Sequence, residues 1–548
     1  MIYFSTLFLS IFATIALIPA FSRLATRYHV GLDIPDARKV HRQPIPRVGG
    51  VAIALAVYAS ALLWVAGGPF LRAYLVASAC LVLFGVIDDV KGLDFRVKFL
   101  SQVIAALIMI LYGGVKIRSL GTLLPVGYLI PETLATPLTL VAIVGVTNAI
   151  NLSDGLDGLA GGICLLIFSC LAYLAYLEGN LTLCLLALAL GGSLFGFLRY
   201  NTYPAQLFMG DTGSQFLGFS AASISLALTQ GKTTLSPLVP LLILGLPVID
   251  TLAVMAQRLA EKKPLFSPDK NHFHHKLMRL GFIHTESVLI IYILQAGLVA
   301  AALLFRFQSD WLLLSGYLCL AMLILIVFHH AERIHWTIPR YDFLDRIVKG
   351  RLKKIRDNAV FIRASFRITE FGLPLLLLAT CIVPSEIPRY FSVLSAVFLA
   401  ALLAVWKFKT RWMRGCLMAV LYLFTPLVVF MSVDRASGAI PGSLLRLYNL
   451  SYPALLLFVV VTLKLTRRQN GFKTTPMDFL IIFLVMVLPE VLRDYVDVKD
   501  LRIVAAKTVM FFFCFEVLMG ELRGKFKKLA FACILPLTLV MVRGLCAV

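Results

Sequence analysis

The chain has 548 residues, of which 60% are hydrophobic and 15% charged, and its mean hydropathy is +0.89. These values exclude a water-soluble globular protein, so lipid is the main solvent of the chain. The net charge of +22 comes from 51 basic and 29 acidic residues. Because the basic residues collect in loops between apolar runs, this charge indicates membrane topology and not nucleic-acid binding.

Apolar runs of about 20 residues, each long enough to cross a bilayer, recur along the whole chain. Eleven of them precede residue 331, centred near residues 11, 58, 80, 106, 143, 168, 190, 221, 246, 295 and 320. The first has no basic n-region and no small-residue cleavage site, which favours a membrane helix over a signal peptide. About seven more follow, near residues 380, 399, 422, 454, 485, 511 and 536. The sequence therefore predicts an all-α, polytopic integral membrane protein.

The distribution of Lys and Arg predicts the orientation of these spans. With the N-terminus outside, alternate loops face the cytoplasm, namely 22–47, 88–98, 151–158, 199–212, 257–285 and 331–371. These loops hold 26 of the 31 Lys and Arg residues in positions 1–371. The positive-inside rule therefore places the N-terminus outside.

The stretch 331–371 separates two membrane regions. It carries ten basic and five acidic residues among Ile, Leu and Phe, a composition typical of an interfacial helix on an anionic leaflet. We therefore expect a membrane domain over residues 1–330, a basic amphipathic linker over 331–371, and a second membrane domain over 372–548. The function of the second domain stays open.

Carboxylates gather at the predicted cytoplasmic ends of the spans. A carboxylate at the bilayer centre costs about 2.5–3.5 kcal/mol on insertion scales, so their placement is informative. Asp88 and Asp89, in GVIDDVKG, end the third run. Two adjacent carboxylates can share a divalent cation or can be an ordinary charged helix end.

The stretch NAINLSDGLDGLAGG begins at Asn148 and contains a second pair of acids. Asp154 and Asp157 share a face if this turn is helical, and the glycines allow close approach of a ligand to the backbone. Small residues here could also form a helix-packing surface. That alternative explains the glycines but not the carboxylates.

The stretch FMGDTGS, residues 208–214, opens the eighth run. Asp211, flanked by glycines, is suited to hold magnesium with positions left for phosphate oxygens and water. Its alternative role is that of a helix N-cap. Phe208 could supply an aromatic face for a base.

Two basic stretches complete the set of motifs. SPDKNHFHHKLMRLGF carries His272, His274 and His275 beside Lys and Arg, which indicates a polyanion site or a metal site. Since carboxylates are available for magnesium, we favour phosphate binding by these histidines, with zinc as the alternative. DIPDARKVHRQPIPRVGG could dock a lipid phosphate or could only set topology.

Together and in this order, the five motifs resemble those of the polyprenyl-phosphate N-acetylhexosamine-1-phosphate transferases of glycosyltransferase family 4. The resemblance covers residues 1 to about 330. The HxHH motif followed by Leu-x-Arg-x-Gly is similar to that of the enzymes that start O-antigen and related glycans. It is less similar to the His triplet of the MurNAc-pentapeptide translocase.

The resemblance implies transfer of a sugar 1-phosphate from a UDP-N-acetylhexosamine to undecaprenyl phosphate at the cytoplasmic face of a bacterial inner membrane. It implies Mg²⁺ as cofactor, with Mn²⁺ as an alternative. The implied catalytic residues are Asp88, Asp89, Asp154, Asp157 and Asp211, of which Asp211, Asp88 and Asp89 would lie at the metal. The implied substrate-binding residues are Asn151, Phe208, His272, His274, His275, Lys39, His41 and Arg47. Phe208 would stack on uracil, and the histidines would hold the pyrophosphate of the donor.

One position departs from the family pattern. Many members continue the acidic pair as DDxxD, whereas here Asp94 follows Asp89 by five residues, so we assign it no catalytic role. Two other functions stay open as alternatives, a MurNAc-pentapeptide transferase and a non-catalytic lipid-binding or transport protein. A homodimer is a further open expectation.

Overall fold

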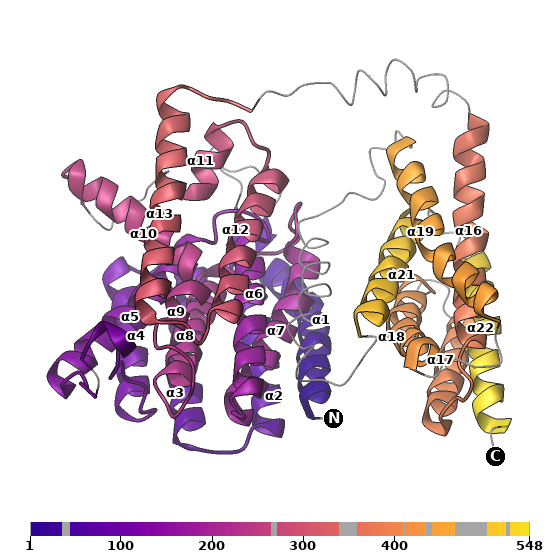
Figure 1. Ribbon diagram of the computed structural model, residues 1–548, viewed down its shortest axis with the longest axis horizontal. Helices are drawn as coiled ribbons and strands as arrows, with labels where there is room; N and C mark the ends of the chain where they lie inside the picture. The colour runs from indigo at the N-terminus through magenta and orange to yellow at the C-terminus, as the bar shows by residue number, and fades with distance from the viewer. Residues whose placement is uncertain are drawn as a thin grey trace. The chain divides into compact units, whose positions relative to one another are not determined.

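The computed structural model describes residues 2–34, 44–125, 127–264, 271–338, 359–408, 413–434, 441–465, 501–521 and 526–546. These residues form two compact units, one up to residue 338 and the other from residue 359 (Figure 1). The predicted all-α class is confirmed, since the described residues are mostly helical and only two short strands pair with each other. Ten helices in the described part of the chain are long and apolar enough to cross a membrane.

The first unit contains the eleven predicted spans. Its long helices are α1 (Ile2–Tyr28), α2 (Gly49–Trp64), α3 (Pro69–Lys91), α4 (Phe95–Leu111), α5 (Glu132–Leu152), α6 (Leu159–Leu177), α7 (Leu181–Asn201), α8 (Gly210–Thr229), α12 (His284–Leu304) and α13 (Asp310–Arg333). The run near residue 246 is two helices, α9 (Val239–Ile243) and α10 (Gly245–Ala260), which meet at Leu244. The short elements are α11 (Phe273–Arg279), η1 (Gly121–Leu123), β1 (Leu32–Asp33) and β2 (Ile45–Pro46).

Local sequence signals account for several helix ends. Pro69 is the first residue of α3, where its missing amide hydrogen costs no helical bond. Asn180 caps α7, its side-chain oxygen accepting from Leu183 N at 3.1 Å. Gly92 follows α3 with a φ of 68°, which a glycine adopts without steric cost.

The helix α8 lies at the centre of this unit, packed against α2, α3 and α5. Two glycines allow this close packing at its first turn. A Cβ on Gly50 of α2 would lie 2.2 Å from Gly213 N, and one on Gly85 of α3 would lie 2.5 Å from Thr212 Cα. The start of α8 is therefore held between the start of α2 and the end of α3.

The second unit contains six helices in its described residues, namely α16 (Ala359–Ile382), α17 (Arg389–Phe408), α18 (Met413–Asp434), α19 (Gly442–Leu465), α21 (Leu501–Glu521) and α22 (Lys527–Cys546). They match six of the seven predicted runs, and the run near residue 485 lies outside the described residues. Of the predicted linker 331–371, the central part likewise lies outside them. Because α16 already begins at Ala359, the last part of that stretch belongs to the second helical unit.

A polar cluster lies within the apolar core of the second unit. The hydroxyls of Tyr448 and Tyr452 lie 2.9 Å apart, and Thr380 Oγ1 lies 3.0 Å from the Tyr452 hydroxyl. Lys507 Nζ lies 4.5 Å from the centre of the Tyr448 ring, within the range of a cation–π interaction. This cluster joins α16, α19 and α21.

Candidate active site

The two adjacent carboxylates at the end of α3 have different partners. Asp89 faces the N-terminus of α8, where its Oδ1 accepts from Asp211 N at 2.9 Å. Its Oδ2 accepts from Thr212 N at 3.1 Å and from Thr212 Oγ1 at 2.6 Å. Since α8 has no side-chain cap of its own, Asp89 caps it from another helix, and its charge favours the positive end of the helix dipole.

Asp88 instead faces a cation that it shares with Asp211. Lys98 Nζ, near the start of α4, lies 2.6 Å from Asp88 Oδ2 and 2.7 Å from Asp211 Oδ2. The other oxygen of Asp88 accepts from Leu93 N at 2.7 Å. Asn151 Nδ2, near the end of α5, donates to Asp211 Oδ1 at 3.0 Å and to Ser214 Oγ at 2.7 Å. Four helix ends thus bring these side chains to one place.

These two carboxylates could hold a divalent cation. Their Oδ2 atoms already converge on one positive charge, the Lys98 ammonium. Magnesium in phosphate-transfer sites commonly takes one or two carboxylates and fills its other positions with water and substrate phosphate. Among the described residues, no group of three or more His, Cys, Asp and Glu side chains converges as a metal site. The two carboxylates fit the protein share of such a coordination sphere.

The loop between α5 and α6 carries Asp154 and Asp157. The pKa of Asp154 is raised from its usual value to about 7, first by burial and then by the negative charges of Asp211, Asp89 and Asp157. Asp154 therefore lies close enough to these three carboxylates for their negative charges to act on it. Arg47 acts in the opposite direction and lowers this pKa.

Asp157 ties its loop to neighbouring segments. Its Oδ2 accepts from Ala205 N at 2.9 Å, and its amide donates to His284 Nε2 at 3.1 Å. The ring of His284 stacks on that of Tyr203, with 4.4 Å between the centroids. Asp157 thus holds the segment that leads to Phe208 and Asp211.

Arg47 and Phe208 lie on two segments that pair through their backbones. Phe208 N donates to Pro46 O at 2.8 Å, and Gly49 N donates to Phe208 O at 3.0 Å. The Arg47 side chain forms an ion pair with Asp33. Of the predicted basic residues near this hairpin, Lys39 and His41 lie outside the described residues.

The three histidines lie next to the loop of Asp154. A Cβ on Gly155 would come 2.3 Å from His274 Nε2, so only a glycine leaves room for this ring. The rings of His272 and His274 are nearly parallel at 6.0 Å, and those of His274 and His275 lie 4.2 Å apart. Burial lowers the pKa of His274 to about 3, with further lowering by His275, His272 and His284. His274 is therefore neutral at pH 7.

Three residues of this region were not predicted from the sequence, namely Lys98, Asp250 and His284. In the sequence, Lys98 is one of several basic residues in the predicted loop 88–98, and His284 is a histidine outside the five motifs. Asp250 is an acid inside an apolar run, a signal that could have been found because such placement is costly. Its partners, His272 and Phe273, become visible only in the folded chain.

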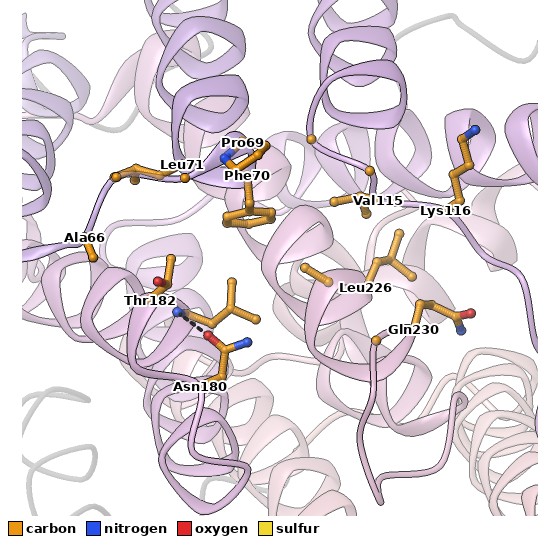
Figure 2. A pocket seen from close by; sticks show the side chains of 17 residues that line it. Ala66, Pro69, Phe70, Leu71, Val115, Lys116, Asn180, Thr182, Leu226 and Gln230 are labelled. Atoms are coloured by element: carbon orange, nitrogen blue, oxygen red, sulfur yellow. Dashed lines mark hydrogen bonds between the residues drawn. The ribbon is translucent and has the colours of Figure 1, made fainter.

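A cavity of about 390 Å³ lies at the ends of α3 and α8 that are opposite to Asp88 and Asp211. It is lined by residues at the start of α3 and α7 and at the end of α8, including Phe70, Thr182 and Gln230 (Figure 2). Its Lys116 pairs with Glu132 at 2.6 Å. Asp88 and Asp211 lie at the opposite ends of α3 and α8, so this cavity is separate from the carboxylate site.

Known proteins resemble the chain over the region that contains this site. The model of glycosyl transferase family 4 matches residues 71–229. A probable undecaprenyl-phosphate N-acetylglucosaminyl 1-phosphate transferase of Bacillus subtilis (strain 168) is 38% identical over 346 residues, which cover 62% of this chain and 95% of the relative. An undecaprenyl-phosphate alpha-N-acetylglucosaminyl 1-phosphate transferase of Escherichia coli O157:H7 is 30% identical over 364 residues, 65% of this chain and 97% of the relative. The protein of the same description from Yersinia pestis is 30% identical over 346 residues, 60% of this chain and 91% of the relative. The chain therefore belongs to glycosyl transferase family 4.

Proposed function

We propose that the chain transfers N-acetylglucosamine 1-phosphate from UDP-N-acetylglucosamine to undecaprenyl phosphate. The observation that carries this proposal is the convergence of Asp88 and Asp211 on one cation at the ends of membrane helices. A site that binds a diphosphate and a lipid phosphate needs a cation that carboxylates hold in place. At the ends of membrane helices, both a water-soluble and a lipid substrate can reach this cation. The names of the relatives, whose length the chain almost fully covers, support undecaprenyl phosphate as acceptor and N-acetylglucosamine 1-phosphate as the transferred group.

The proposed reaction is a single displacement at phosphorus. An oxygen of the lipid phosphate attacks the β-phosphorus of the nucleotide sugar, the bond to the bridging oxygen breaks, and UMP leaves. A phosphate monoester with a second pKa near 6 is already largely dianionic at pH 7, so no protein base is required. Positioning and charge neutralisation are the tasks left to the protein.

We assign Asp88 and Asp211 to a magnesium ion, with manganese as the alternative. When bound, the ion neutralises charge on the diphosphate and on the leaving UMP. Lys98 would leave the carboxylate oxygens as the ion arrives and would then be free to pair with a phosphate oxygen. Asn151 keeps Asp211 oriented from its other oxygen.

The remaining residues bind and position the substrates in this proposal. Asp89 and Asp157 hold the backbone segments that present Asp211 and Phe208. Phe208 stacks on uracil and Asp154 lines the donor pocket. The histidines bind the diphosphate, whereas Arg47, with Lys39 and His41, receives the lipid phosphate.

We propose that the carboxylate ends of α3 and α8 face the cytoplasm of a bacterial inner membrane. The positive-inside rule supports this orientation. Labelling of single cysteines introduced near Asp94 and Lys232 tests it from the two sides of sealed vesicles. If the cysteine near Asp94 were labelled only from the side opposite to the cytoplasm, the proposed orientation would be wrong.

The lipid-linked product would start O-antigen or a related cell-surface glycan. The competing substrate is UDP-MurNAc-pentapeptide, and the names of the relatives favour N-acetylglucosamine. A transporter is the alternative from another class. It is disfavoured because the acids of this site lie at helix ends and not in the middle of the spans.

One assay tests the proposed function. The purified full chain is incubated with undecaprenyl phosphate, Mg²⁺ and, separately, UDP-N-acetylglucosamine, UDP-N-acetylgalactosamine and UDP-MurNAc-pentapeptide. We expect UMP and a lipid-linked sugar in equal amounts, fastest with UDP-N-acetylglucosamine. Preference for the pentapeptide donor, or absence of UMP with all three donors, would contradict the proposal.

A further inference from the structure

Tyr292 is a buried side chain of α12 that reaches the loop of Asp154 and Asp157. It is 1% exposed, and its hydroxyl donates to Gly158 O at 2.6 Å. Gly162, one turn into α6, leaves the space for this ring, because a Cβ there would collide with the hydroxyl oxygen. The approach of Tyr292 therefore accounts for the last glycine of the NAINLSDGLDGLAGG stretch.

The other side of Gly158 is held by α7. Gly158 N donates to Asn201 Oδ1 at 2.9 Å, and Asn201 Nδ2 donates to Leu207 O at 2.9 Å. Asn201 is buried, so both hydrogen bonds are shielded from water. The amide of this one side chain thus joins the loop of Asp157 to the residue that precedes Phe208.

Gly158 depends on these contacts because its own backbone has little conformational preference. It is the N-cap of α6, with a φ of 80°. A glycine adopts positive and negative φ about equally well, so its hydrogen bonds decide which conformation it keeps. Gly162 N also donates to Gly158 O at 2.9 Å, but this bond lies within the first turn of α6. Asn201 and Tyr292 connect Gly158 to two other helices, one through its amide and the other through its carbonyl.

The conformation of Gly158 determines how the preceding loop is oriented. Asp157 is its direct neighbour, and a change of φ at Gly158 would turn the loop relative to α6. Asp154 and Asp157 would then move together, and the bond between Asp157 Oδ2 and Ala205 N would be disturbed. In an active site, a displacement of 1 Å can cost about a hundredfold in rate.

We propose that Tyr292 is a positioning residue for the nucleotide sugar, because its hydroxyl fixes the loop of Asp154 and Asp157. It acts through Gly158. This inference rests on the proposed function, in which Asp154 lines the donor pocket and Asp157 holds the segment of Phe208. It goes beyond that function by assigning a task to a residue of a membrane span outside the five motifs. The purely structural alternative is that Tyr292 only packs α12 against α6.

The substitution Tyr292→Phe tests this role because it removes the hydroxyl and keeps the ring. The matched control is Tyr317→Phe in α13. Tyr317 is also buried, and its hydroxyl likewise donates to a glycine carbonyl, Gly245 O, at 3.1 Å. Each variant thus loses one buried hydrogen bond to a glycine, but only Tyr292→Phe loses it at the loop between α5 and α6.

The experiment compares the wild type and both variants of the full chain in detergent with Mg²⁺. We expect Tyr292→Phe to raise the dissociation constant of UDP-N-acetylglucosamine at least fivefold, and to leave KM for undecaprenyl phosphate within twofold. Tyr317→Phe should change both quantities less than twofold. Both variants should have a lower thermal midpoint, because each loses a buried hydrogen bond. Hydrogen–deuterium exchange of residues 153–158 should be faster in Tyr292→Phe and unchanged in Tyr317→Phe.

A dissociation constant of Tyr292→Phe less than fivefold above that of the wild type would show a packing role alone and overturn the inference. So would equal losses of donor affinity in the two variants, or an exchange of residues 153–158 as slow as in the wild type. A wild-type protein that binds UDP-N-acetylglucosamine but releases no UMP would contradict the proposed function alone, and the binding comparison would still decide on Tyr292. Absence of donor binding by the wild type would overturn both.

Discussion

Asp89 holds the helix that carries Asp211, since its carboxylate accepts hydrogen bonds from the amides of Asp211 and Thr212 at 2.9 and 3.1 Å. The preceding residue, Asp88, lies beside the side chain of Asp211, and both carboxylates pair with Lys98. Two neighbours in sequence therefore have separate tasks. Asp89 positions a backbone, and Asp88 provides an oxygen for a cation.

Loss of the Asp89 carboxylate should destabilise the first unit. Asp89→Ala removes a helix cap, which costs about 0.5–2 kcal/mol, and also leaves the Thr212 hydroxyl without this acceptor. We expect a measurable fall in the thermal midpoint of the detergent-solubilised protein. Asp94→Ala is the control, because Asp94 is exposed and makes no side-chain cap bond to α4. Equal midpoints for the two variants would contradict the capping role.

Asp211→Asn should give a folded protein that has lost nearly all activity. The amide keeps the shape of the carboxylate but loses the charge that binds a divalent cation. We expect UMP release to fall more than a hundredfold, by the order of 3 kcal/mol in the barrier, while the thermal midpoint stays close to that of wild type. Turnover within threefold of wild type at saturating Mg²⁺ would rule out Asp211 as the principal metal ligand.

Lys98→Met should bind magnesium more tightly than wild type. The Lys98 ammonium and a divalent cation compete for the same two oxygen atoms, one on Asp88 and one on Asp211. Without the ammonium, the two carboxylates also repel each other until a cation arrives. We expect half-maximal thermal stabilisation at an Mg²⁺ concentration at least threefold lower than for wild type.

The control for this substitution is Lys116→Met, which alters an ion pair with Glu132 at the opposite end of the unit. Its Mg²⁺ dependence should match wild type. A Lys98→Met protein that needs as much Mg²⁺ as wild type, or more, would show that the cation binds elsewhere. EDTA should abolish UMP release by wild type, and added Mg²⁺ should restore it.

Gly50→Ala should impair the fold around the site. A Cβ there would lie 2.2 Å from Gly213 N and 2.5 Å from Gly213 Cα, and backbone atoms cannot move aside as a flexible side chain can. The start of α8 would have to shift, and Asp211 with it. We expect loss of most activity together with a lower thermal midpoint. Gly145→Ala in α5 is the control, because a Cβ there meets nothing within 4 Å.

The sequence was informative wherever a strong physical constraint acts on single residues. Helices that cross lipid must be apolar over about 20 residues, so the spans of the first unit could be predicted from hydropathy alone. The break at Leu244 was missed although local signals for it are present, since Pro247 has no N–H to donate to Ile243 O. The motif acids were found because charge near a membrane is rare.

Contacts between residues that lie far apart in the sequence could not be predicted. Lys98 lies 113 positions from Asp211 in the chain, and Asp250 lies 22 positions from His272. Each is one charge in a loop or a span, and its role depends on the fold that brings it to a partner. The separate tasks of Asp88 and Asp89 were also hidden, because both oxygens of Asp89 face the backbone or side chain of a helix that starts more than a hundred residues later.

Removal of the second unit should leave sugar-phosphate transfer measurable. Every residue assigned to the site lies at or before His284, and the helices that carry these residues and Tyr292 belong to the first unit. Ile338 N donates to Leu280 O at 2.9 Å, so the chain must extend at least to this residue. The domain boundary predicted from the sequence lies after Phe371, but α16 runs from Ala359 to Ile382, and a cut at Phe371 would leave half of an apolar helix. The cut therefore belongs between residues 340 and 358.

We expect a monodisperse protein in detergent whose kcat/KM for UDP-N-acetylglucosamine is within tenfold of that of the full chain. Monodispersity is the necessary control, because loss of a unit can destabilise what it contacts. A monodisperse truncated protein that binds UDP-N-acetylglucosamine but releases no UMP would show that the second unit completes the active site.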